Sequence, residues 1–184
     1  IVDEDICRGM AEAGCITILY GLESGDEIAL ANMGKNTTIE MIEDGIAATK
    51  KAGMNIWLPC MFGNIGETRE SIEKTVNLLI KHAPIERRTL RPVTPYPGSP
   101  LYQYALDKGL IRDHDHFFEI SKNPDLLTVN FTEMSDREFY DSLMESNDKL
   151  LNAFYDRKKQ DDIESYRKLY YENDDSGFAI PDRV

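Results

Sequence analysis

The sequence of 184 residues has few cysteines, fewer Lys and Arg residues than Asp and Glu residues, and no long apolar run. Its three cysteines, at positions 7, 15 and 60, are an odd and widely spaced set. Such a set fits neither a disulfide framework nor a zinc signature, and it favours a reducing, cytoplasmic compartment. No apolar stretch approaches the ~20 residues of a membrane helix, so we predict no membrane span. The net charge of -12 disfavours nucleic acid as a partner.

The composition that is present, 41% hydrophobic and 29% charged residues, is that of a globular protein with one core. The sequence starts at Ile1, without an initiator Met or a signal-like stretch. We therefore expect it to be part of a longer protein.

Helical and strand patterns alternate through the first half of the chain. Helical spacing of apolar residues, with capping residues at the ends, predicts helices over 3–14, from the capping box 37–40 to Gly53, and around 72–80. Nearly continuous apolar runs predict strands, buried on both faces, over 15–22 and 55–62, and a third between 85 and 93. This order indicates βαβ units and a parallel sheet.

The second half begins at a dense turn signal over 95–100, followed by a short helix to about Lys108. No clear period covers 112–134, so we predict an irregular segment there, packed by apolar residues: Phe117, Phe118, Leu126, Leu127 and Phe131. A capping box at 135–138 opens a long helix to about Tyr171, and the residues after Asn173 are predicted to be loose. We divide the chain into a domain over 1–112 and a helical C-terminal extension over 113–184.

Three candidate ligand-binding segments follow the predicted strands, where parallel barrels bind their ligands. Glu23 offers a carboxylate to sugar hydroxyls or an ammonium group, or it caps a helix beginning near Asp26. The segment 63–68 offers glycines and a capping Thr68, or it is an ordinary strand-to-helix turn. The prolines of 91–102 build a rigid ledge for a flat ligand, or they form a structural turn.

Several short motifs together resemble the second half of the radical S-adenosylmethionine (radical SAM) enzyme core. Their order and spacing match over about residues 1–112, and they comprise Ala13-Gly14-Cys15, Tyr20-Gly-Leu-Glu-Ser-Gly25, Leu30 with Met33-Gly-Lys35, Ala52-Gly53, Phe62-Gly-Asn-Ile-Gly-Glu-Thr68 and Thr94-Pro-Tyr-Pro-Gly-Ser-Pro-Leu-Tyr102. The resemblance implies an α/β fold, a TIM-like partial (β/α) barrel of which this chain supplies about three parallel strands with their helices.

The same resemblance implies a [4Fe-4S] cluster that reductively cleaves S-adenosylmethionine to a 5′-deoxyadenosyl radical. Glu23, with Ser24 beside it, matches the polar residue that contacts the ribose or methionine of that cofactor. The stretch Met61, Phe62, Gly63 is similar to the element that meets adenine, and Val93 and Thr94 to Tyr96 to the backbone ledge beside it. These eight residues are our predicted cofactor-binding set. Lys35 matches a basic position without an assigned contact.

The sequence departs from the family pattern in the cluster-binding Cys-x3-Cys-x2-Cys loop, which these 184 residues lack. We interpret Cys7, Cys15 and Cys60 as buried apolar residues and predict no metal ligands here. Asn64 and Ile65 stand where many relatives have Leu-Pro or Phe-Pro. We therefore expect no radical chemistry from this chain alone. The longer parent enzyme would bind both the cluster and S-adenosylmethionine.

The sequence after the proline ledge looks most like the subgroup with an N-terminal cobalamin-binding domain, which methylates or forms rings on unactivated carbon. Cobalamin would then bind to a domain outside these residues, and the small-molecule substrate stays open. The alternatives are a noncatalytic protein-interaction module built on a half barrel, and an unrelated barrel enzyme that binds phosphate at 63–68. Open barrel edges also predict that the chain forms a homo-oligomer or folds its long helix over the open side.

Overall fold

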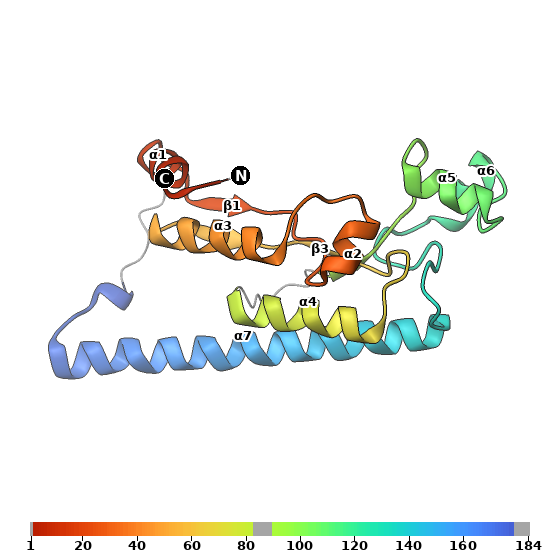
Figure 1. Cartoon of the computed structure of the whole chain (residues 1–184). Helices are drawn as coiled ribbons and strands as arrows, with labels where there is room; N and C mark the ends of the chain where they lie inside the picture. The colour runs from red at the N-terminus through yellow and green to blue at the C-terminus, as the bar shows by residue number, and fades with distance from the viewer. Residues whose placement is uncertain (1, 83–89, 179–184) are drawn as a thin grey trace.

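The computed structural model describes residues 2–82 and 90–178 and shows an α/β protein with short parallel strands (Figure 1). Its elements, in chain order, are α1 (Glu4–Glu12), β1 (Thr17–Leu19), α2 (Glu27–Asn32), α3 (Ile39–Lys51), β2 (Asn55–Trp57), β3 (Cys60–Phe62), α4 (Arg69–His82), β4 (Leu90–Pro92), α5 (Pro100–Asp107), α6 (His114–Ile120), α7 (Asp136–Glu172) and a 3-10 turn, η1 (Ser176–Phe178). None of these helices is long and apolar enough to span a membrane.

The strands form two parallel pairs, as the alternation of helices and strands predicts. β1 pairs with β2, with Ile18 opposite Ile56, and β3 pairs with β4, with Met61 opposite Arg91. A single bridge between Glu23 and Cys60 joins the two pairs, so the segments 17–23, 55–62 and 90–92 lie side by side. The parallel α/β arrangement is thus observed, and its origin in a barrel stays a proposal. The predicted start of the third strand lies outside the described residues.

Pro59 breaks the predicted strand 55–62 into β2 and β3, because proline has no backbone N–H for the sheet. The segment from Leu19 to Glu23, which pairs with residues 57–60, contains one residue more than those residues do. Leu19 lies opposite Trp57, 38 positions apart, whereas Glu23 lies opposite Cys60, 37 positions apart. Such a bulge kinks the strand, and here Leu22 N–H donates to the Tyr20 carbonyl oxygen over 2.8 Å.

The prediction that the first two strands are buried on both faces is wrong for β1 and β2. Helices α1 and α3 cover one face, where Ile18 packs beside the buried side chains of Cys7 and Ala48. The other face carries Leu19 and Trp57, which are 55% and 45% exposed. The apolar run therefore indicates a strand correctly without indicating how many of its faces are covered.

The helix ends follow the capping signals in the sequence. Asp3 caps α1 by accepting from Ile6 N–H, and the Ser135–Glu138 capping box opens α7. Helix α3 starts one residue later than its predicted box, because Thr38 and not Thr37 accepts the hydrogen bond from Met41 N–H. The predicted long helix is continuous to Glu172.

The long helix α7 lies parallel to α4, below it in Figure 1. Three contacts keep a nearly constant offset between the two helices: Arg69 to Glu145 at 3.3 Å, Glu73 to Lys149 at 3.2 Å, and Arg157 Nη2 to the Ile80 carbonyl oxygen at 3.2 Å. Under these contacts Phe139, Leu143 and Leu150 join Phe62, Leu79 and Leu90 in the main core. Helix α7 therefore covers the helix-bearing side of the sheet and leaves Leu19 and Trp57 exposed.

The segment 112–134 is less irregular than predicted, because it contains α6, capped by Asp113. Phe117 is buried in a second core with Tyr102 and Ile111. Phe118 and Leu126, which we expected to pack inside, are more than half exposed. A short helix with one buried aromatic is enough to hold this segment.

Gly63 provides a test of how the long helix is seated. Its φ is 88°, and a Cβ atom there would lie 2.5 Å from the Phe139 ring, whereas Gly53 has a φ of 75° with open space around it. We expect Gly63→Ala to lower the free energy of unfolding by roughly 3 kcal/mol and Gly53→Ala by roughly 1 kcal/mol, because only the first adds a clash to the left-handed strain. Urea denaturation measures both, and equal losses would contradict the seating of Phe139 over Gly63.

Candidate functional site

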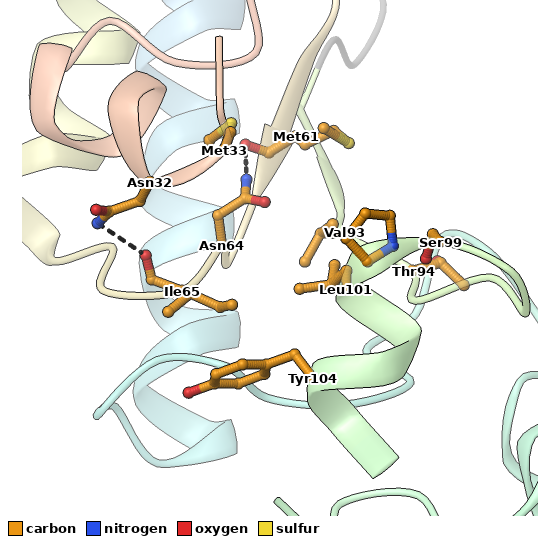
Figure 2. Close-up of a pocket in the computed structure, with 11 residues that line it drawn as sticks. Asn32, Met33, Met61, Asn64, Ile65, Val93, Thr94, Ser99, Leu101 and Tyr104 are labelled. Atoms are coloured by element: carbon orange, nitrogen blue, oxygen red, sulfur yellow. Dashed lines mark hydrogen bonds between the residues drawn. The ribbon is translucent and has the colours of Figure 1, made fainter. Parts of the chain in front are cut away.

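A cavity of about 480 Å³ opens beyond the C-terminal ends of β3 and β4 (Figure 2). The wall is formed by the end of α2, by β3 and the turn after it, by the residues after β4, and by α5 with the residue before it. The lining residues are Asn32, Met33, Met61, Asn64, Ile65, Val93, Thr94, Ser99, Pro100, Leu101 and Tyr104. Its size is within the ~300–1,000 Å³ of small-molecule sites, and strand C-terminal ends are the usual place for one.

Two amide side chains fix the cavity wall. Asn64 Nδ2 donates to the Met61 carbonyl oxygen at 3.5 Å, and Asn32 Nδ2 donates to the Ile65 carbonyl oxygen at 3.4 Å, which ties α2 to the turn after β3 (Figure 2). Methionine, aliphatic and proline side chains form most of the remaining surface, and Tyr104, Thr94 and Ser99 add an aromatic ring and hydroxyls. Such a wall suits a flat heterocycle that carries hydroxyl groups.

The carboxylate of Glu67 holds the turn that forms one side of the cavity. Its Oε2 atom accepts hydrogen bonds from Gly63 N–H at 2.5 Å and Asn64 N–H at 3.1 Å. The side chain is buried, and this burial raises the pKa of the carboxyl to about 7, although the two backbone donors act in the opposite direction. Glu67 therefore fixes the shape of the cavity wall without lining the cavity itself.

Three of the eight predicted cofactor residues, Met61, Val93 and Thr94, lie together in the cavity wall. The structure does not bring the other five there. Phe62 is in the main core, with its ring 5.2 Å from that of Phe139, and Gly63 lies under the same ring. The remaining three are Ser24, Tyr96 and Glu23.

Ser24 is fully buried and makes only contacts within the protein scaffold. Its hydroxyl lies 3.3 Å from that of Thr75 and accepts a hydrogen bond from Asp26 N–H at 3.2 Å. Tyr96 is more than half exposed and lies edge-on to Phe117 at 6.0 Å. Neither residue lines the cavity.

Glu23 lies next to the cavity wall through its backbone. Its carbonyl oxygen accepts from Met61 N–H at 3.3 Å, while its carboxylate lies 3.5 Å from Lys35 Nζ, which also donates to the Gly21 carbonyl oxygen. The alternative that Glu23 caps the next helix is wrong, because Asp26 accepts from Ala29 N–H there. Glu23 also has a φ of 65°, a left-handed conformation that costs energy for any residue except glycine.

Sequence reasoning missed the Asn32 amide and the Tyr104 ring. Asn64 and Ile65 belong to the candidate segment 63–68, and Ser99 to Leu101 belong to the proline ledge, so position after a strand signalled these five. Asn32 and Met33 end a helix, and Tyr104 lies inside one. No spacing in the sequence connects these last three residues to the cavity.

The cysteines do not form a cluster site. Cys7 and Cys60 are buried, the Cys7 sulfur is 3.7 Å from the Thr49 hydroxyl, and burial raises the pKa of the Cys60 thiol well above its usual range. Over residues 2–82 and 90–178, no three Cys, His, Asp or Glu side chains are grouped so as to hold a metal ion. An iron-sulfur cluster therefore does not fit the cysteines described here.

Fold and cavity define an α/β protein with a small-molecule site at the ends of parallel strands. Residues 1–79 match the family model of the radical SAM superfamily. The resemblance drawn from its motifs is thereby confirmed.

Three named proteins are similar to part of this chain. An uncharacterized methyltransferase of Pyrococcus horikoshii is 32% identical over 109 residues, which are 59% of this chain and 24% of that protein. The bacteriochlorophyllide d C-8(2)-methyltransferase of Chlorobaculum tepidum is 31% identical over 61% of this chain and 25% of its own length. The anaerobic magnesium-protoporphyrin IX monomethyl ester cyclase of Cereibacter sphaeroides is 24% identical over 62% and 19%. The chain thus spans a quarter or less of these relatives.

The conformation of Glu23 gives a second prediction. Glycine adopts a φ of 65° without strain, whereas alanine pays the same backbone cost as glutamate. Both substitutions remove the ion pair with Lys35, so they differ only in the backbone. We expect Glu23→Gly to be more stable than Glu23→Ala by about 1 kcal/mol in urea denaturation. The reverse order would show that the backbone is not left-handed at this position.

The raised pKa of Glu67 gives a pH prediction. Between about pH 4.5 and pH 7 the folded protein keeps this carboxyl protonated while the unfolded chain loses the proton, so stability falls as the pH rises through that window. The loss is on the order of 3 kcal/mol if the full shift acts. Denaturant unfolding at pH 5 and pH 8 should show it, and Glu67→Gln should remove it. A Glu67→Gln variant that keeps the whole pH dependence would contradict the assignment.

Proposed function

We propose that this chain is the cofactor-binding C-terminal half of the barrel of a radical SAM enzyme, and that the cavity beyond β3 and β4 takes the adenosyl group of S-adenosylmethionine. One observation supports this most strongly. Met61, Val93 and Thr94, which the family resemblance places beside adenine, come from β3 and from the residues after β4, and they meet in the wall of one cavity.

The roles of the residues follow from their places. Met61 and Val93 offer apolar surface to the base, Thr94 and Ser99 offer hydroxyls, and Tyr104 offers a ring face. Glu67 keeps the turn after β3 in the shape that the base requires. Glu23 would turn its carboxylate from Lys35 towards the ribose or methionine, a change that breaks one partly buried ion pair.

The iron-sulfur cluster, which supplies the electron that cleaves S-adenosylmethionine, would be held by a Cys-x3-Cys-x2-Cys loop outside these 184 residues. We therefore propose that the chain alone binds the cofactor without producing 5′-deoxyadenosine. The names of the relatives, two methyltransferases and a cyclase, support methylation or ring formation as the reaction of the whole enzyme. A separate cobalamin-binding domain is part of the same proposal, as is a cytoplasmic location.

The exposed face of β1 and β2 supports the half-barrel interpretation. Leu19 and Trp57 lie on the side away from α1 and α3, where the interior of a barrel would be. We propose that this face packs against the rest of the barrel in the parent protein.

Cofactor binding is the direct test. Isothermal titration of the 184-residue chain with S-adenosylmethionine should show one weak site, and Leu101→Trp should weaken it at least tenfold by filling the cavity. The matched control is Leu126→Trp, at an exposed leucine outside the cavity, which should leave the affinity unchanged. Circular dichroism checks that both variants are folded.

Two results would contradict the proposal. The first is no binding of S-adenosylmethionine at millimolar concentration by the folded chain. The second is equal affinity in Leu101→Trp and the unmodified protein. Anaerobic reconstitution with iron and sulfide adds a separate readout, because 5′-deoxyadenosine formed by the chain alone would show that its own residues hold a cluster.

A further inference from the structure

Helix α7 carries a second apolar stripe, separate from the one buried in the main core. Its members are Met144, Leu151, Tyr155, Ile163, Tyr166 and Tyr170, which are between 38% and 71% exposed. The steps between them, 7, 4, 8, 3 and 4 residues, are close to whole turns of a helix. The stripe therefore runs along one face of α7.

This face is opposite the buried one. At about 100° per residue the six stripe residues fall within an arc of roughly 120°, while Phe139, Leu143 and Leu150, which pack in the core, project from the other side of the helix. A solvent-exposed helix face normally carries charged and polar residues. Two opposite apolar faces indicate a helix that binds something on each.

The second half of α7 also extends beyond α4. Figure 1 shows the helix continuing past the end of α4. Arg157 still donates to the Ile80 carbonyl oxygen in the last turn of α4, and α7 then continues for a further 15 residues to Glu172, next to η1. The stripe residues Ile163, Tyr166 and Tyr170 lie in this extension, where the rings of the two tyrosines stack at 6.1 Å.

The charges within the stripe match a second copy of the same helix in the antiparallel direction. Lys158-Lys159-Gln160-Asp161-Asp162 separates the two apolar groups. A twofold axis between Gln160 and Asp161 places Lys159 opposite Asp162 of the second copy, Tyr155 opposite Tyr166, and Leu151 opposite Tyr170. A parallel pair would instead place Lys159 opposite Lys159, with like charges in contact.

We infer that α7 forms an isologous, antiparallel homodimer through the part of this stripe from Leu151 to Tyr170, with its twofold axis at Gln160–Asp161. The interface is one helix pair, which is a small contact, so its dissociation constant should be in the micromolar range. It uses no residue of the cavity and none of the exposed face of β1 and β2. The proposed dimer is therefore independent of the proposed cofactor binding.

Charge exchange tests the proposal without disturbing the core. Sedimentation equilibrium of the 184-residue chain from 1 to 200 μM should show a monomer–dimer equilibrium, a range chosen to bracket roughly micromolar affinity. Lys159→Glu and Asp162→Lys each bring like charges together and should raise the dissociation constant at least tenfold. The double variant K159E/D162K restores opposite charges and should recover the dimer. The comparison of Asp162→Lys with the double variant isolates the contact between copies, since both lose the intrahelical pair of Asp162 with Lys158.

A tyrosine pair provides the apolar control. Tyr166→Ala, in the stripe, should weaken the dimer at least tenfold, while Tyr171→Ala, on the other side of the helix and 83% exposed, should not change it. A monomer at all concentrations would overturn the proposal. A dimer that all of these variants leave unchanged would overturn it too, and would assign self-association to the face of Leu19 and Trp57.

The direction of pairing has its own measurement. A spin label is attached to Glu172→Cys in a chain that also carries Cys15→Ser, so that the partly exposed Cys15 is not labelled. Pulsed electron paramagnetic resonance then measures the distance between the labels of the two copies. The antiparallel dimer places the labels roughly 35 Å apart along the helix axis, from 1.5 Å per residue over twice 11.5 residues. A parallel dimer would place them about 10 Å apart, the ordinary spacing of packed helices, and would overturn the proposed axis.

Discussion

The two hydrogen bonds from Gly63 and Asn64 to the Glu67 carboxylate are the contact on which the rest of this structure depends. They close the turn between β3 and α4, so they fix where α4 begins and where α7 can pack upon it. The same turn presents Asn64 and Ile65 to the cavity. A buried carboxylate is costly, and the two backbone donors, which would otherwise lack partners, offset part of that cost. Site and scaffold thus share one small set of polar contacts.

Local signals in the sequence placed the long helices but not α6, and they were insufficient for the extent and burial of the strands. Capping residues such as Asp3 and Ser135 act through hydrogen bonds to their own first turn, so a reader of the sequence can place them within a residue. A strand depends on its neighbour. Pro59 and the bulge before Glu23 shorten the observed strands relative to the apolar runs, and exposure of Leu19 and Trp57 depends on what else is present to cover them.

The candidate site shows the same division. Met61, Val93 and Thr94 follow from strand ends and motif order, because both are linear features of the chain. Glu23 was predicted as a ligand-facing carboxylate, yet a lysine 12 positions later binds it, and Ser24 points into a polar contact with Thr75. Asn32 and Tyr104 come from helices whose approach to the cavity depends on tertiary packing. Motifs therefore locate the mouth of the site better than they assign its individual contacts.

The extra residue between Leu19 and Glu23 constrains the length of this segment as well as its composition. Side chains alternate between the two faces of a strand, so one additional residue reverses which face every later side chain occupies relative to its partner. Leu22 is buried and Glu23 reaches Lys35 because the bulge lies before them. Chains that keep every residue type here but lose one position would expose the leucine and bury the carboxylate. An insertion or deletion at Tyr20–Leu22 is thus a more severe change than most substitutions nearby.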